Sequence, residues 1–139
     1  MSESKFRRDL VKDLRARGAH AVPIEAAFTK GIPDLNWCAP DTWAELKYLK
    51  RLPVKEATPV RLEHFTNEQV IWLQDRGRAG GRAVLMSQIG KEYFVHTWRH
   101  ARRIQKAEYN KTQFRSTARL VTSKRSELIE WCLDEEAKV

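Results

Sequence analysis

Two short stretches of this 139-residue sequence, Gly31-Ile32-Pro33-Asp34-Leu35 and Trp43-Ala44-Glu45-Leu46-Lys47, decide how the chain is expected to fold. The first stretch leads into a predicted strand at residues 35–38, and the second lies within another predicted strand at residues 42–48. An Ala-Pro-Asp-Thr turn separates the two strands, as turn residues of this kind commonly do. We therefore expect two neighbouring strands joined by a tight turn, with the other elements arranged around them.

The side chains of these two strands form a candidate metal site. Side chains alternate along a strand, so Glu45 and Lys47 share one face, whereas Ala44 and Leu46 point the other way, into the core. Asp34, at the start of the neighbouring strand, can bring its carboxylate beside Glu45. Two converging carboxylates suit Mg²⁺, and a nearby ammonium group can orient a water or neutralise charge developing on a phosphate.

The rest of the chain predicts an α/β fold in which helices lie on a mixed sheet. A first helix is expected over residues 3–17 because its apolar residues recur on one face, and Gly18 follows it. The other expected elements are a strand at 20–25, a loop around 28–31, a long loop at 49–65, a helix at 66–76, a turn at 76–81, strands at 82–87 and 93–97, and helices at about 98–109 and 124–137. The stretch between the last two helices is ambiguous.

The composition indicates a single folded domain. The sequence is 42% hydrophobic and 32% charged, which is typical of a chain that folds. No apolar run approaches the roughly 18–20 residues that span a bilayer, and the charged amino end predicts no secretory signal. The two cysteines, Cys38 and Cys132, cannot form a disulfide framework. We therefore expect no membrane partner and a cytoplasmic location.

The positive charge is concentrated in one region. The net charge is +8, and residues 98–125 contain nine Lys or Arg residues and one acidic residue. A concentrated positive face attracts polyanions such as DNA or RNA, although a solvated basic helix face would give the same pattern. The basic residues expected to hold a nucleic-acid backbone are Lys50, Arg51, Lys55 and Arg61 in the long loop, and Arg99, Arg102, Arg103 and Lys106 after it.

The ordered motifs resemble the PD-(D/E)XK nuclease superfamily, and specifically the small phage VRR-NUC and Holliday-junction-resolvase-like endonucleases. The resemblance covers about residues 3–87 and is carried by Glu3-Ser4-Lys5-Phe6, by the two stretches quoted above and by Gln69. It implies a restriction-endonuclease-like core, a mixed central sheet flanked by helices, at residues 1–97. Residues 98–139 would then be a basic helical extension packed on the same domain.

The resemblance also implies roles for individual residues. Asp34 and Glu45 would bind a divalent metal, Mg²⁺ with Mn²⁺ as substitute, together with the backbone carbonyl of Leu46. Lys47 would position or activate the attacking water. Gln69 matches a helix glutamine that many members place beside this lysine.

Two of these implied roles have alternatives. Gln69 is equally suited to be the third helical residue of a capping box that begins at Thr66. Glu3 matches the first-helix acid that completes the metal shell, but the equivalent position in junction-resolving members falls on Arg7. Glu25, at the end of the first strand, is the substitute ligand if Glu3 lies too far away.

The expected function is structure-selective hydrolysis of DNA phosphodiester bonds by a metal-dependent endonuclease of phage type. No helix carries a base-reading pattern, so branched or junction DNA is favoured over a specific sequence. A homodimer would supply the two sites that a junction requires. Two alternatives remain open: a non-catalytic nucleic-acid-binding protein on a nuclease-like scaffold, and an RNA-directed nuclease. The resemblance also implies a role in recombination, replication or DNA breakdown.

Overall fold

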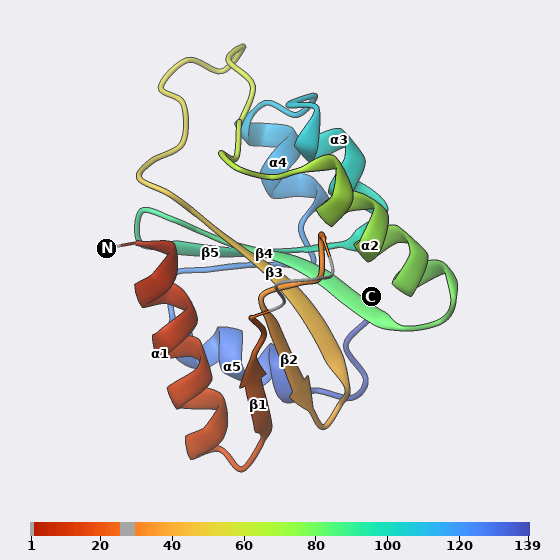
Figure 1. Ribbon diagram of the computed structural model, residues 1–139. Coiled ribbons are helices and arrows are strands. Elements are labelled where there is room, and N and C mark those ends of the chain that lie inside the picture. The colour runs from red at the N-terminus through yellow and green to blue at the C-terminus, as the bar shows by residue number, and fades with distance from the viewer. Residues whose placement is uncertain (1, 26–29) are drawn as a thin grey trace.

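The computed structural model describes residues 2–25 and 30–139 (Figure 1). The loop expected around Phe28 lies largely outside the described residues. The elements, in chain order, are α1 (Glu3–Ala16), β1 (His20–Pro23), β2 (Leu35–Cys38), β3 (Thr42–Leu49), α2 (Asn67–Arg78), β4 (Arg82–Ile89), β5 (Glu92–Thr97), the 3₁₀ turn η1 (Trp98–His100), α3 (Ala101–Gln105), α4 (Lys111–Thr117), β6 (Leu120–Thr122) and α5 (Arg125–Leu133).

The described residues form a six-stranded mixed sheet in which the strands follow their order in the sequence, from β1 to β6. Strands β3 and β4 are parallel, and each other neighbouring pair is antiparallel. Two parallel strands need a long crossover connection, which the chain supplies with the segment 50–66 and helix α2. The α/β fold class predicted from the sequence is therefore confirmed.

Helices cover both faces of the sheet. Helices α1 and α5 lie on one face, and α2, α3 and α4 lie on the other (Figure 1). Each face has its own apolar cluster: Leu10, Trp37 and Leu46 belong to the first, and Leu73, Leu85 and Phe114 to the second. The face that carries Glu45 and Lys47 is therefore buried too. Ala44 and Leu46 point into the first cluster, as expected, and the segment after β3 and helix α2 fold back over the other face of this strand.

The carboxyl-terminal third differs most from expectation. The helix expected at 98–109 is split into η1 and α3, and α3 ends before Ala107, which has a positive φ of 54°. The ambiguous stretch forms α4 and the short strand β6, which pairs with β5. A three-residue strand at a sheet edge leaves almost no alternating pattern to detect. Helix α5 ends at Leu133 because the chain becomes extended at Asp134.

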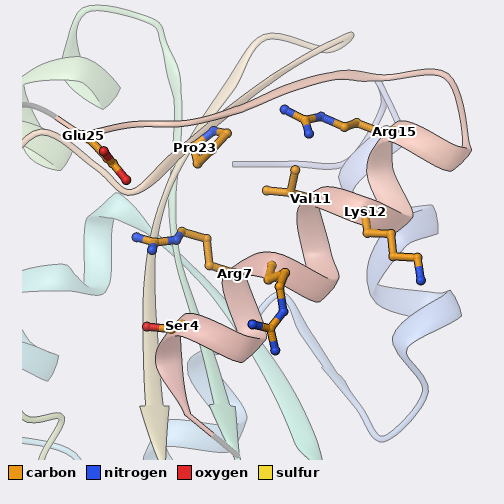
Figure 2. A pocket seen from close by; sticks show the side chains of 8 residues that line it. Ser4, Arg7, Val11, Lys12, Arg15, Pro23 and Glu25 are labelled. Carbon is orange, nitrogen blue, oxygen red and sulfur yellow. The ribbon is translucent and has the colours of Figure 1, made fainter.

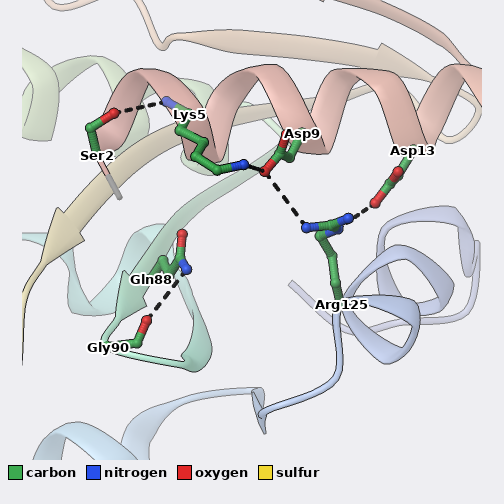
Figure 3. Close-up of polar contacts among 7 residues, drawn as sticks. All are labelled: Ser2, Lys5, Asp9, Asp13, Gln88, Gly90 and Arg125. Atoms are coloured by element: carbon green, nitrogen blue, oxygen red, sulfur yellow. Dashed lines mark hydrogen bonds and ion pairs between the residues drawn. The ribbon is translucent and has the colours of Figure 1, made fainter.

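Contacts across the sheet and between helices hold this carboxyl-terminal third to the rest. The buried Trp37 indole on β2 donates to the carbonyl of Cys132 on α5, at 2.9 Å. Between the helices, Arg125 of α5 pairs with Asp9 and Asp13 of α1, and within α1 Lys5 pairs with Asp9 (Figure 3). Part of the positive charge of residues 98–125 is therefore neutralised by acids from elsewhere. No helix in the described part of the chain is long and apolar enough to cross a membrane.

Candidate active site

Asp34 lies just before β2 and extends the pairing between β2 and β3. The paired residues end at Leu35 and Ala44. Beyond them, an Asp34 carboxylate oxygen accepts a hydrogen bond from the backbone N–H of Leu46 at 2.9 Å. The carboxylate thus takes the position that a backbone carbonyl would have occupied in a longer strand. As a result, Asp34 is held against β3 beside Glu45.

The Leu46 carbonyl lies on the same side of β3 as the Leu46 N–H. In a strand, the N–H and C=O of one residue point toward the same neighbouring strand. Because the N–H of Leu46 points to Asp34, its carbonyl points toward this side as well. The pairing of β2 with β3 ends at Leu35 and Ala44, so the Leu46 carbonyl lies beyond the last residue of β3 that pairs with β2.

Glu45 and Lys47 form a buried pair on the face covered by α2. Their side chains are 1% and 3% exposed, and Lys47 Nζ lies 3.2 Å from one Glu45 carboxylate oxygen. Lys47 Nζ also donates to the carbonyl of His64 at 2.9 Å and lies 5.7 Å from the centre of the Phe65 ring. The ammonium group is therefore held in place from two sides, by β3 and by the segment that leads into α2.

The surroundings of Glu45 disfavour its charged form. Its pKa is raised to about 9, first by burial and then by the neighbouring Asp34 carboxylate, against the opposing charge of Lys47. Neither carboxylate oxygen has a hydrogen-bond partner within the described residues. Buried oxygens without partners are costly, and a divalent cation between two carboxylates is one way to satisfy them. The donor set therefore fits a hard, oxygen-binding metal ion.

Of the two alternative third ligands, Glu3 is the one near this pair. The half-buried Glu3 has a raised pKa, mainly through burial, with Asp34 adding to the rise and Lys47 opposing it. Glu25 is exposed and lines a separate cavity along α1. Among residues 2–25 and 30–139, no three Asp, Glu, His or Cys side chains already form a closed metal shell. The charges of Asp34 and Lys47 therefore affect Glu3, but the Glu3 carboxylate does not meet the other two carboxylates closely enough to form a three-ligand group.

The comparisons with known proteins concern the fold. No protein family matches the sequence, and no curated protein matches it. Among solved structures, the chain is similar to the 1.6 Å structure of Hjc from Archaeoglobus fulgidus, a Holliday junction resolvase from an archaeal hyperthermophile. The TM-score is 0.52 at 20% identity, over 70% of this chain and 73% of that chain. The chain therefore shares its fold with this structure.

Gln69 completes a helix cap at the start of α2. Its side-chain oxygen accepts from the Thr66 N–H at 2.9 Å, and the Thr66 hydroxyl accepts from the Gln69 N–H at 3.2 Å. This is the reciprocal capping box that the sequence offered as the alternative reading. The side-chain oxygen of Gln69 is thus engaged in its own helix. A catalytic role for Gln69 stays a prediction.

The basic residues expected to bind nucleic acid differ in whether other residues of the fold already contact them. Arg102 and Arg103 are already engaged: Arg102 donates to Asn67 and Gln105, and Arg103 pairs with Glu108. Arg99 is exposed and lies over the Trp98 ring. The remaining residues are exposed, with no ion pair or side-chain hydrogen bond within the described part of the chain: Lys50, Arg51, Lys55, Arg61 and Lys106.

The sequence analysis missed two residues that adjoin Lys47. His64 supplies the carbonyl that accepts from the ammonium, and it adopts a left-handed φ of 59°. Ser87 is the register partner of Lys47 on β4, and its buried hydroxyl has no hydrogen-bond partner among the described residues. The sequence held one indication of where His64 would lie. Phe65 and Val70 flank the capping box, and such a pair packs as a hydrophobic staple that fixes the direction in which the chain, including His64, enters α2.

Gly31 sets how closely the segment before Asp34 approaches α2. It has a φ of +81°, and a Cβ at this position would lie 2.3 Å from the carbonyl oxygen of Glu68. Gly18 has a similar φ of +91°, but a Cβ there would meet nothing within 4 Å. A side chain at Gly18 would therefore cause backbone strain alone, whereas a side chain at Gly31 would cause the same strain and also a steric clash with α2.

We expect Gly31→Ala to lower the free energy of unfolding by about 3 kcal/mol or more, and Gly18→Ala by only about 1–2 kcal/mol. The larger loss follows because the methyl group at residue 31 must push α2 away, in addition to straining the backbone. Urea unfolding of both variants measures the difference. Equal losses would show that Gly31 is not needed for close packing.

Proposed function

We propose that this protein is a metal-dependent nuclease that hydrolyses DNA phosphodiester bonds, with a preference for branched DNA. The observation that carries the proposal is the buried Glu45 carboxylate: Lys47 and Asp34 lie beside it, and neither of its oxygens accepts a hydrogen bond from the described residues. A purely structural ion pair would be expected to have its oxygens satisfied by hydrogen bonds. The similarity in fold to Hjc, a Holliday junction resolvase, agrees with this proposal.

The residues divide the chemistry between them. Asp34, Glu45 and the Leu46 carbonyl would hold a divalent metal, Mg²⁺ or Mn²⁺, with Glu3 completing the shell. When bound, the metal offsets negative charge that develops on the phosphate. Lys47 orients the water that attacks phosphorus, because its ammonium is fixed between Glu45 and the His64 carbonyl. Such fixed donors cost little reorganisation during the reaction.

Branched DNA is the substrate that the remaining observations favour. The structurally similar Hjc is a Holliday junction resolvase. The exposed cations Lys50, Arg51, Lys55 and Arg61 lie in the segment that directly follows β3, so they can contact phosphates beside the site. Two copies of the chain would provide the two cuts that a junction needs. A phage origin, a cytoplasmic location and a role in recombination stay predictions.

Cleavage of defined DNA substrates tests the proposal. We expect the protein to cut a four-way junction with Mg²⁺ or Mn²⁺ faster than linear duplex, single strand or flap. Asp34→Asn, Glu45→Gln and Lys47→Ala should each lower the cleavage rate by about 100-fold or more, because the first two remove a charged metal ligand and the third removes the donor that orients the attacking water. Each variant should still bind DNA.

The matched control for cleavage is Lys138→Ala, which removes an exposed charge near the carboxyl terminus. Its rate should equal that of the native protein. If the native protein binds DNA and cuts nothing with either metal, the protein is a binding scaffold rather than an enzyme. Faster cleavage of RNA of the same structure would assign it to RNA.

Metal binding can be measured separately from cleavage. We expect Mg²⁺ or Mn²⁺ to raise the melting temperature by several degrees, because a ligand that binds only the folded state stabilises it. Glu45→Gln should abolish this rise, and Glu3→Gln should reduce it. Glu25→Gln should leave it unchanged, since Glu25 lies in a different cavity. The opposite result for Glu3 and Glu25 would exchange their roles.

A further inference from the structure

Helix α1 presents three different faces. One face buries Phe6, Leu10 and Leu14 in the core beneath the sheet. A second face carries the ion pairs of Asp9 with Lys5 and with Arg125 (Figure 3). The third face is basic and is turned toward the segment that follows β1.

This third face forms one wall of a cavity of about 550 Å³. Four cations line the cavity, Arg7, Arg8, Lys12 and Arg15, against a single carboxylate, Glu25 (Figure 2). The other lining residues include the Ser4 hydroxyl and the apolar side chains of Val11 and Pro23. The cavity therefore combines positively charged side chains with an apolar surface. Phosphates separated by sugar rings present the complementary combination.

Three of the four cations of this cavity have no side-chain partner among the described residues. Arg15 donates to the carbonyl of Ala21 at 3.1 Å. Within residues 2–25 and 30–139, the side chains of Arg7, Arg8 and Lys12 form no ion pair and no hydrogen bond. Arg8 and Lys12 are also like charges four residues apart, an arrangement that destabilises a helix. The stability of α1 therefore does not explain this group of cations, and an external anion would relieve their repulsion.

One end of the cavity lies beside Glu3 on α1. Ser4, which lines the cavity, directly follows Glu3, and Arg7, which also lines it, lies about one helical turn after Glu3. From Arg7 to Arg15 the helix rises about 12 Å at 1.5 Å per residue. That length corresponds to roughly three to four nucleotides of one strand at 3.4 Å each. The basic face thus extends away from Glu3 on the side where β1 lies.

We propose that this cavity binds the phosphodiester backbone of one DNA strand as it leaves the candidate metal site. The proposal rests on the proposed function and adds a second contact surface to the one expected at residues 50–61. A strand held on both sides of the scissile phosphate cannot slide along the site. In this arrangement Arg7 positions the strand beside Glu3, and Arg8 and Lys12 hold the phosphates that follow.

The test compares two double variants that lose the same charge. Arg8→Gln with Lys12→Gln removes two cations of the cavity, and Arg78→Gln with Lys138→Gln removes two exposed cations elsewhere. Binding to a labelled four-way junction is measured by fluorescence anisotropy in EDTA, so that no cleavage occurs, over a series of salt concentrations. All four positions are half-buried or exposed, and melting temperatures verify that both proteins fold.

We expect the cavity variant to bind about tenfold more weakly than the control at 100 mM salt. The slope of log Kd against log salt should fall by about 2, since each lost phosphate contact contributes about 0.9. If the native protein binds DNA and both variants bind equally well, the cavity proposal is wrong and the proposed function stands. If the native protein binds no DNA, the proposed function fails as well.

Two further probes identify the ligand class. Single-stranded RNA of matched length and vesicles containing phosphatidylserine are offered to the same proteins. A loss of affinity confined to DNA, or larger for DNA than for either probe, supports a DNA strand in the cavity. A loss confined to the vesicles would assign the cavity to a lipid surface, and tighter binding of RNA with an equal loss would assign it to RNA. Either result overturns the proposal.

Discussion

The hydrogen bond from the Leu46 N–H to the Asp34 carboxylate is the contact on which the candidate site depends. It forms where the pairing of β2 with β3 ends, and so it joins the loop before β2 to the middle of the central strand. It turns the Asp34 side chain toward β3, while the Asp34 carbonyl accepts a hydrogen bond from the N–H of Ile24 at 2.8 Å on the other side. The close approach of Gly31 to α2 holds the same loop from the other face.

The second constraint is the burial of charge. Strand β3 carries Glu45 and Lys47 into a face that α2 covers, and this position costs free energy that an exposed pair would not cost. Part of the cost is offset by the His64 carbonyl, which accepts from Lys47. Glu45 has the ion pair with Lys47 at 3.2 Å, but neither of its oxygens accepts a hydrogen bond from the described residues. Apolar residues in place of both charges would avoid this cost.

The sequence predicted the parts of the fold that local patterns encode. The alternation around Glu45 and Lys47, the turn before Thr42 and the capping box at Thr66 are short-range features, and the structure contains them. It did not predict that a second layer covers Glu45, because that depends on the path of residues 50–66. Strand β6 was missed because three residues at a sheet edge carry too little pattern.

In the candidate site too, the features that depend on short-range patterns were predicted, and those that depend on the path of the chain were not. Asp34, Glu45 and Lys47 were placed together because the strand periodicity fixes their relative positions. The basic face of α1 was not recognised, because four cations on a helix resemble an ordinary solvated surface until β1 is seen beside them. Whether Glu3 or Glu25 lies nearer the pair depended on the path between α1 and β1, which no local pattern encodes.

The most direct test of the central claim is a crystal structure of the protein with Mn²⁺, with anomalous scattering used to locate the metal. The account predicts one strong anomalous peak between the carboxylates of Asp34 and Glu45, within coordination distance of the Leu46 carbonyl, and no such peak in Glu45→Gln. A peak at Glu25 or elsewhere on the surface, with none between Asp34 and Glu45, would contradict it.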